Sequence, residues 1–345
     1  MFSSQRAIGL LASAVDRMAT AAVRMGRTTP WSPEGDELFE LYESIASFYE
    51  ARGPSFFPDP APIEPWVVRR ENAADLSWPS RHELLDRAVA AELSDYVANS
   101  ACHVRLRSRL DEGGQRRPVA VFIHGYLAGT YAVEERVWPL ARLDRLGFDT
   151  ALFTLPFHGL RAVTGTRSAP PFPGRDPAIN IETFRQSVCD LRDFLGWLRR
   201  EGHPDVGLVG MSLGGYTAAL TATVDPDLAF LVPVIPLACL VDFAVEQGHL
   251  PIGSPRALRL ERALRRAYGS VSPCGRPPLV EGRRVLVIGA RADQITRVNH
   301  ARRLAHHFSA PLHVWPGGHL VQWGRAEAFA RLAEHLSASV RLPRG

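Results

Sequence analysis

Short apolar runs alternate with amphipathic segments along the chain from Val119 onward. Predominantly apolar runs of four to seven residues are typical of strands buried on both faces. These runs are Val119–Ile123, Thr150–Leu155, Val206–Val209, Ala229–Ile235, Val285–Gly289 and Pro311–Trp315. The amphipathic segments predict helices, which are Val133–Leu146, Ile181–Arg199, Gly215–Leu220, Val298–Phe308 and Ala326–Leu336. Such an alternation predicts an α/β fold with a mostly parallel, doubly wound sheet and helices on both of its faces.

The first third of the chain has a different pattern. Three segments repeat apolar residues at spacings of three and four and predict helices, namely residues 3–27, Glu37–Tyr49 and Arg81–Ser94. Between the last two, Arg52–Pro65 contains five prolines and is expected to be extended or irregular. We therefore predict that residues 1–95 form a helical extension with a proline-rich arm, packed on a main domain of residues 96–345. That domain begins with a half-exposed antiparallel strand, because apolar and polar residues alternate over 102–108.

The strongest candidate for chemistry is Gly210-Met211-Ser212-Leu213-Gly214, which lies between an apolar run and a predicted helix. A strand, then Gly-x-Ser-x-Gly, then a helix is the context of a nucleophile elbow. The serine must sit on a tight, strained turn, and glycines two residues before and after it leave room for the neighbouring backbone. The alternative interpretation is an ordinary strand-to-helix turn.

The partners of a catalytic serine follow in order. Asp293 comes just after the run 285–289, and His319 just after the run 311–315. Serine, acid and histidine in this order, each after a strand, resemble the α/β-hydrolase superfamily, and its serine esterases in particular, over roughly residues 100 to 340. The resemblance implies Ser212 as the nucleophile, His319 as its base and Asp293 as the acid that orients the histidine. Asp242, which follows the run 229–235, is the rival for the acid.

An oxyanion hole is expected from backbone N–H groups at two places. One is Leu213, next to the nucleophile, and the other is Tyr126 or its neighbour Leu127, in the turn after the run 119–123. His124 in that turn is interpreted as a brace for the loop. His158 in Pro-Phe-His-Gly resembles a loop of family esterases and is interpreted as structural or pocket-lining.

The substrate pocket is expected to include these groups and residues from an insertion. His124, Leu127 and His158 would line it, with Met211 beside the nucleophile and Leu240 from the segment 236–283. That segment has 48 residues, whereas connections in α/β units usually have two to six. In the superfamily an insertion at this point commonly forms a cap, so we expect a helical cap over the pocket.

Composition narrows the remaining classes of function and the cellular compartment. With 46% hydrophobic and 22% charged residues the chain is typical of soluble globular proteins. The net charge of +4 comes from scattered arginines without interleaved aromatics, which argues against nucleic-acid binding. Four widely separated cysteines without metal-ligand spacing favour a reducing cytoplasm. No run approaches the ~18 apolar residues that span a bilayer, and no clean cleavage site marks a secretory signal.

The sequence therefore predicts a serine hydrolase that cleaves a carboxylic ester or related acyl bond through an acyl-enzyme intermediate. Its partner would be a small-molecule acyl substrate, and neither a metal nor an organic cofactor is implied. Acyl transfer, peptide cleavage or a non-catalytic binding protein on the same fold are the alternatives. The basic helix at residues 3–27 can also contact a membrane surface weakly or a second copy of the chain; we favour its docking on the protein's own body or on such a homodimer partner.

Overall fold

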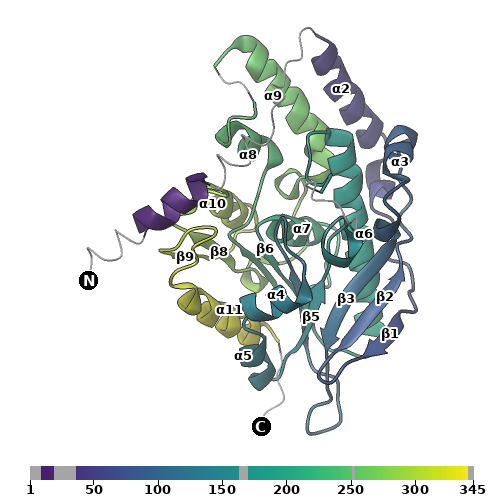
Figure 1. Ribbon diagram of the computed structural model, residues 1–345, viewed down its shortest axis with the longest axis vertical. Helices are drawn as coiled ribbons and strands as arrows, with labels where there is room; N and C mark the ends of the chain where they lie inside the picture. Colours follow the sequence, from purple (N-terminus) through teal and green to yellow (C-terminus); the bar gives the residue numbers. More distant parts are fainter. Residues whose placement is uncertain (1–8, 19–35, 163–169, 251–252, 341–345) are drawn as a thin grey trace.

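A nine-stranded sheet runs through the computed structural model, which describes residues 9–18, 36–162, 170–250 and 253–340 (Figure 1). The strands lie in the order β1-β2-β3-β5-β4-β6-β7-β8-β9. They are β1 (Trp66–Arg69), β2 (Ala74–Pro79), β3 (Ala101–Arg107), β4 (Val119–Ile123), β5 (Asp149–Phe153), β6 (Val206–Met211), β7 (Leu231–Val234), β8 (Val287–Ala290) and β9 (Leu312–Trp315). From β5 to β9 all neighbours are parallel, whereas β1, β2 and β3 join the edge antiparallel. The predicted α/β fold with a mostly parallel sheet is confirmed.

Helices cover both faces of the sheet. Besides a helix at residues 9–18, the long and short helices are α2 (Glu37–Glu50), α3 (Arg87–Leu93), α4 (Tyr131–Val137), α5 (Leu140–Arg145), α6 (Pro177–Arg200), α7 (Leu213–Thr221), α8 (Leu240–Glu246), α9 (Pro255–Ala267), α10 (Val298–His307) and α11 (Arg325–Ser339). The central strand β4 shows why the sheet needs two layers, since all five of its residues are buried. Val119, Val121 and Ile123 join a core cluster with α6, α7 and α10, while Ala120 and Phe122 join one with α5 and α11.

Two predicted helices differ from the structure at points that have local causes. The helix predicted at 133–146 is two helices, α4 and α5, because Pro139 interrupts the hydrogen-bond ladder between them. The helix predicted at 81–94 begins only at Arg87. Asp86 precedes it and caps it, accepting hydrogen bonds from the N–H groups of Ala88 and Val89.

The sheet also extends into the segment predicted as a helical extension, which corrects that part of the prediction. Residues 66–79 form β1 and β2, and β2 pairs with β3 over six residues, from Ala74 opposite Leu106 to Pro79 opposite Ala101. Trp78 on β2 is fully buried and stacks on Phe194 of α6. The helix predicted at 3–27 is described only at 9–18, and the rest of it lies outside the described residues.

Polar side chains of α6 hold the proline-rich arm against that helix. Arg185 and Arg192 donate hydrogen bonds to the backbone carbonyls of Phe56 and Pro58, both at 2.5 Å. Further along the chain, the fully buried Glu182 accepts a hydrogen bond from the N–H of Leu85 at 2.9 Å. These charge-assisted bonds fix a segment that has few backbone hydrogen bonds of its own.

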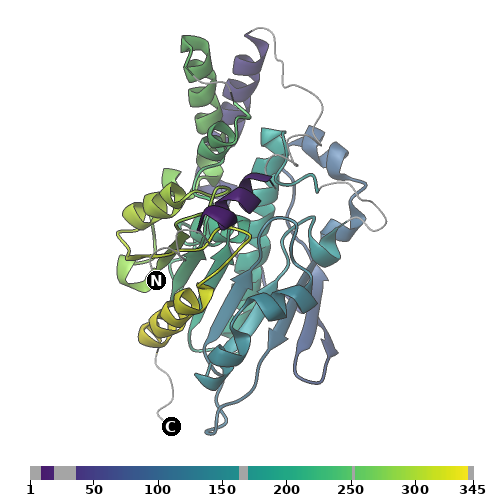
Figure 2. The ribbon, with the colours of Figure 1, turned by 60° about the vertical axis from the view of Figure 1, so that its left-hand side comes forward.

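The predicted insertion 236–283 contains α8 and α9. Helix α9 lies alongside α2, and both views of the ribbon show this pair projecting beyond the sheet (Figures 1 and 2). Arg266 of α9 forms ion pairs with Glu43 and Glu50 of α2. Whether this segment acts as a cap on the pocket stays a prediction.

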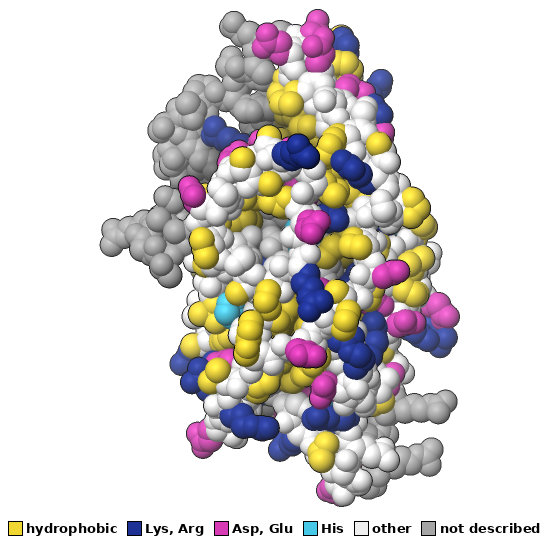
Figure 3. Space-filling view, turned by 90° about the vertical axis from the view of Figure 1, so that its right-hand side faces the viewer, with side chains coloured by type: hydrophobic (Ala, Val, Ile, Leu, Met, Phe, Trp, Pro, Cys, Tyr) yellow, Lys and Arg dark blue, Asp and Glu magenta, His cyan; other side chains and the backbone are white. Residues whose placement is uncertain are grey.

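The surface mixes charges of both signs. On the face shown in Figure 3, arginines and acidic side chains are interspersed, and neither sign forms a continuous patch. Within the described ranges, no helix is both long enough and apolar enough to span a bilayer.

Candidate active site

Ser212 lies at the sharp turn from β6 into α7. Its backbone has φ +54° and ψ −110°, a conformation that is rare for residues other than glycine. The strain is held by backbone hydrogen bonds on both sides, from the Ser212 N–H to the Val234 carbonyl at 3.0 Å and from the Leu237 N–H to the Ser212 carbonyl at 3.2 Å. Strained residues of this kind cluster at functional sites, and the geometry is that of a nucleophile elbow.

The two glycines of the motif are required by close backbone approach. A Cβ on Gly210 would collide with the backbone of Gly214, and a Cβ on Gly214 would collide with the carbonyl groups of Ile123 and His124 at the end of β4. Helix α7 can therefore start directly against the sheet only because these positions have no side chain.

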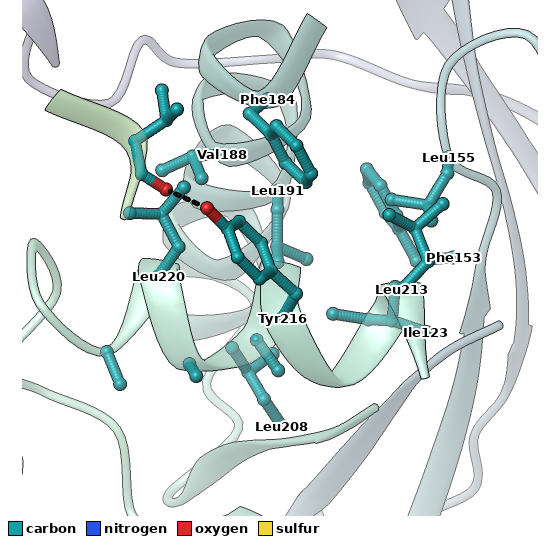
Figure 4. Packing of buried hydrophobic residues seen from close by; sticks show 14 of the residues in the cluster. Ile123, Phe153, Leu155, Phe184, Val188, Leu191, Leu208, Leu213, Tyr216 and Leu220 are labelled. Atoms are coloured by element: carbon teal, nitrogen blue, oxygen red, sulfur yellow. Dashed lines mark hydrogen bonds between the residues drawn. The ribbon is translucent and has the colours of Figure 1, made fainter. Parts of the chain in front are cut away.

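Helix α7 is held rigidly behind the serine. Figure 4 shows Tyr216 of α7 facing Phe184 of α6, with ring centroids 4.6 Å apart. The Tyr216 hydroxyl donates a hydrogen bond to the Val271 carbonyl at 2.9 Å, which satisfies the polar end of a buried ring. The packing fixes the position from which Ser212 projects.

Asp293 and His319 form a hydrogen-bonded pair. The Nδ1 atom of His319 lies 2.8 Å from Oδ2 of Asp293, and the Asp293 side chain is fully buried. Asp293 follows β8 and His319 follows β9, so the carboxyl ends of parallel strands bring both to the edge where Ser212 follows β6. The rival acid Asp242 lies on α8 and instead forms ion pairs with Arg265 and Arg303.

Backbone groups orient the Asp293 carboxylate. Its Oδ1 accepts hydrogen bonds from the N–H groups of Ile295 and Thr296, both at 2.8 Å, which leaves Oδ2 for His319. The Thr296 hydroxyl lies 3.1 Å from Oδ2 and 3.0 Å from Nδ1 of His319. Sequence reasoning missed Thr296, because a threonine three residues after the candidate acid has several ordinary uses in a turn and is no distinctive signal.

The environment of His319 tunes its basicity. Burial alone would lower the pKa of the imidazole, but the charge and hydrogen bond of Asp293, together with the charge of Asp16, raise the pKa of His319 above its ordinary value. A histidine whose charged form is stabilised in this way is suited to take a proton from a hydroxyl.

No hydrogen bond joins the hydroxyl of Ser212 to the ring of His319 in the structure, although both residues are among those described. Such contacts are often long in enzymes without substrate and shorten when the substrate binds. The serine and the His319–Asp293 pair thus share one edge of the sheet without a closed hydrogen-bond chain.

The backbone around Ser212 offers hydrogen-bond donors for an oxyanion. Leu213 is the first residue of α7, so its N–H has no acceptor within the helix. On the other side, the loop after β4 passes close to the nucleophile, since a Cβ on Gly125 would lie 3.5 Å from the Ser212 Cβ. Tyr126 and Leu127 follow, and Leu127 has φ +60° and is 65% exposed.

The two histidines beside this loop differ in their contacts. His124 braces the loop, because its Nδ1 lies 2.7 Å from the Gly125 carbonyl and its Nε2 accepts a hydrogen bond from the Leu155 N–H at 3.0 Å. His158 uses Nδ1 on the Pro156 carbonyl at 2.8 Å, while its Nε2 is buried without a hydrogen-bond partner. Burial lowers the pKa of His124 to about 3 and that of His158 to about 4, so both are neutral at pH 7.

The last two pocket candidates come from β6 and α8. Met211 ends β6, and its sulfur is 3.5 Å from the Gln322 side-chain nitrogen on the loop that carries His319. Leu240 begins α8 and packs, half-buried, on the main core cluster. Within the part of the chain that is described, no group of three or more His, Cys, Asp or Glu side chains is arranged to hold a metal ion.

A contact that sequence reasoning missed comes from the helix at residues 9–18. Its Asp16 side chain, which is fully buried, accepts hydrogen bonds from the N–H groups of His319 at 2.9 Å and Gln294 at 3.2 Å. No local pattern signals this role, because residues 16 and 319 are brought together only by the complete fold.

Comparison with known sequences gives two results. A family model described as alpha/beta hydrolase domain containing 18 matches residues 178–243. Uncharacterized proteins from two strains of Mycobacterium tuberculosis are 32% identical over 209 residues, which is 59% of this chain and 50% of each relative. The chain thus spans about half the length of the curated relatives it matches.

Comparison with solved structures concerns the fold. An acetyl xylan esterase from Thermoanaerobacterium superposes with a TM-score of 0.56 and 18% identity, covering 89% of this chain and 95% of that one. An acetyl xylan esterase from Paenibacillus superposes with a TM-score of 0.54 and 17% identity, and the match covers 88% of this chain and 96% of that one. A puromycin-hydrolyzing peptidase of Mycobacterium tuberculosis superposes with a TM-score of 0.50 and 17% identity, and the match covers 71% of this chain and 38% of that one. The sheet order, the elbow and these similarities show that the chain is a protein of the α/β-hydrolase fold.

Proposed function

We propose that the protein is a serine hydrolase that cleaves a carboxylic ester or a related acyl bond. The observation that carries the proposal is the 2.8 Å contact between Nδ1 of His319 and Oδ2 of Asp293, at the same sheet edge as the strained Ser212. A serine hydroxyl is a weak nucleophile at neutral pH and needs a base, and an oriented imidazole supplies one. A strained elbow at the same sheet edge as a histidine paired with a buried carboxylate has no evident use in a binding protein.

In the proposed reaction the Ser212 oxygen attacks the acyl carbon while Nε2 of His319 takes the hydroxyl proton. The tetrahedral oxyanion would be bound by the N–H groups of Leu213 and Tyr126. His319 then gives its proton to the leaving alcohol, and an acyl ester on Ser212 remains. A water molecule attacks this ester, His319 takes the water's proton and returns a proton to Ser212, and the carboxylic acid is released.

Two features favour this chemistry at the oxyanion. The N-terminal end of α7 points its partial positive charge toward the place where the negative charge develops. The loop of Gly125 and Tyr126 is braced by His124, whose two ring nitrogens contact the backbone of Gly125, after β4, and of Leu155, after β5. Donors held in advance cost little reorganisation during the reaction, which is why such holes are effective.

The test is covalent labelling by a fluorophosphonate, which needs no knowledge of the natural substrate. We expect the protein to label at Ser212, and Ser212→Ala to remove both the label and the turnover of p-nitrophenyl esters. Ser94→Ala, which changes an exposed serine far along the chain, is the matched control and should label normally. A folded protein that repeatedly fails to label would contradict the proposal. Adding an alcohol in competition with water then separates hydrolysis from acyl transfer by the products formed.

A further inference from the structure

One carboxylate from the start of the chain links the two loops that carry the acid and the histidine. Oδ2 of Asp16 accepts hydrogen bonds from the N–H of Gln294, next to Asp293, and from the N–H of His319 itself. Oδ1 accepts one from the N–H of Leu320 at 3.0 Å. The helix that carries Asp16 lies beside these loops in both ribbon views (Figures 1 and 2).

The rest of the helix face fits the same two loops. One turn before Asp16, the Ser13 hydroxyl donates a hydrogen bond to the Ala292 carbonyl at 2.9 Å. Ala12 is fully buried against the histidine loop, where a Cβ on Gly318 would lie 3.1 Å from the Ala12 Cβ and 3.0 Å from an Asp16 oxygen. The helix therefore packs on both loops at once.

The chemistry of these contacts calls for an ionised carboxylate. A buried carboxylate is stable only when its oxygens are paired, and N–H groups of three residues supply charge-assisted hydrogen bonds to it. Because the acceptors sit on one rigid group, they set the distance between the backbone of Gln294 and that of His319. That distance determines how Nδ1 of His319 meets Asp293, whose own oxygens are already fixed by its loop.

We propose that Asp16 is a positioning residue of the active site, which holds the acid loop and the histidine loop in register. The inference rests on the proposed function, since it assigns Asp16 a role toward the His319–Asp293 pair. Asp16 touches neither the reacting serine nor an acyl group in this scheme, and it acts through the backbone of His319.

The position of Asp16 also has an electrostatic consequence. The charges of Asp293, on the loop after β8, and Asp16, on the N-terminal helix, both favour the protonated imidazole of His319. Removing the Asp16 charge would therefore make His319 a weaker base. The acidic limb of the pH–rate profile would move to lower pH, whereas a change in stability alone would leave the limb in place.

The test is Asp16→Asn. An asparagine has a single side-chain oxygen, so its NH₂ group must face at least one of the three N–H donors, and the charge is lost. We expect the rate constant of fluorophosphonate labelling to fall about 10- to 10²-fold, the size of effect expected when a reacting group is misplaced by about 1 Å. We also expect kcat to change by a larger factor than KM, and the acidic limb of the pH–rate profile to move to lower pH. Labelling at the wild-type rate with an unmoved limb would overturn the proposal.

Ser13→Ala is the matched control, because it removes a buried hydrogen bond from the same helix face but no charge. It should leave the acidic limb unmoved. Labelling of the wild-type protein tests the proposed function separately. If the wild type fails to label, the role of Ser212 is contradicted, whatever the result for Asp16→Asn. Amide hydrogen exchange is a second measurement that needs no activity. The N–H groups of Gln294, His319 and Leu320 should be protected in the wild type and exchange faster in Asp16→Asn, and equal exchange in both proteins would also overturn the proposal.

Discussion

Replacing Asp293 by asparagine tests the assignment of the acid at the level of single atoms. Oδ1 of Asp293 accepts two backbone N–H groups, from Ile295 and Thr296, while Oδ2 faces Nδ1 of His319. The asparagine oxygen will occupy the Oδ1 place, because an NH₂ group there would face two donors. Its NH₂ group then faces His319 and donates to Nδ1. This binds the tautomer whose Nε2 carries the proton, and that tautomer cannot accept a proton from Ser212.

The size of the effect follows from the neighbouring hydroxyl. A serine protease with the same substitution lost about 10⁴-fold in kcat, or roughly 5.4 kcal/mol at 1.36 kcal/mol per factor of ten. Here Thr296 offers a second oxygen 3.0 Å from Nδ1 of His319, which can accept the Nδ1 proton in a fraction of molecules. We therefore expect a loss of about 10³- to 10⁴-fold for Asp293→Asn. Adding Thr296→Val should remove the residual activity.

The assay is the hydrolysis of p-nitrophenyl acetate together with the rate of fluorophosphonate labelling. Asp242→Asn is the matched control, because Asp242 pairs with Arg265 and Arg303 on the protein's helices and should be dispensable for the reaction. Near-normal turnover by Asp293→Asn, with loss of turnover in Asp242→Asn, would refute the reasoning and move the acid to α8.

Three further predictions concern the elbow, the pH dependence and the pocket. Gly214→Ala should lower the free energy of unfolding, measured by urea titration, by several kcal/mol or prevent folding, because its Cβ meets the Ile123 backbone. Gly269→Ala, whose Cβ meets nothing within 4 Å, should be nearly neutral. The base must be neutral to accept a proton, and the pKa of His319 is raised above 6.5, so kcat/KM should fall as the pH drops through a value above 6.5. An acidic limb of the kcat/KM profile that lies below pH 6.5 would contradict this. Leu240→Ala should change the ratio of kcat/KM between short and medium acyl esters, and an unchanged ratio with altered stability would count against a cap.

Much of the site could be predicted because its signals are local. The elbow needs glycine at fixed positions around Ser212, and the acid and base each follow an apolar strand, so chain order and strand ends were sufficient to place all three at one edge. Strand β4 was predicted with its exact bounds, because both of its faces are buried and every residue is apolar or small.

The parts that were missed lack a local signal. All four residues of β1 are exposed, so no alternation of buried and exposed positions marks it as a strand. Asp16 looks like an ordinary charged residue within the amphipathic helix predicted at 3–27, and its role depends on partners 278 to 304 positions away. Thr296 acts through its hydroxyl in a turn where a threonine has several ordinary uses.

The contact between Asp16 and His319 also bears on how the protein is made. Residues are added from the amino end at roughly 5 to 20 per second, so the 303 positions between the two partners take roughly 15 to 60 s. During the last part of this time, over the 107 positions from Ser212 to His319 (319 − 212), the elbow is already synthesised, but the Asp16 carboxylate still has no histidine loop to hold. In the proposed scheme, a ribosome-bound chain at this stage therefore carries the nucleophile without its base, and the base reaches its final position only when the two distant segments meet.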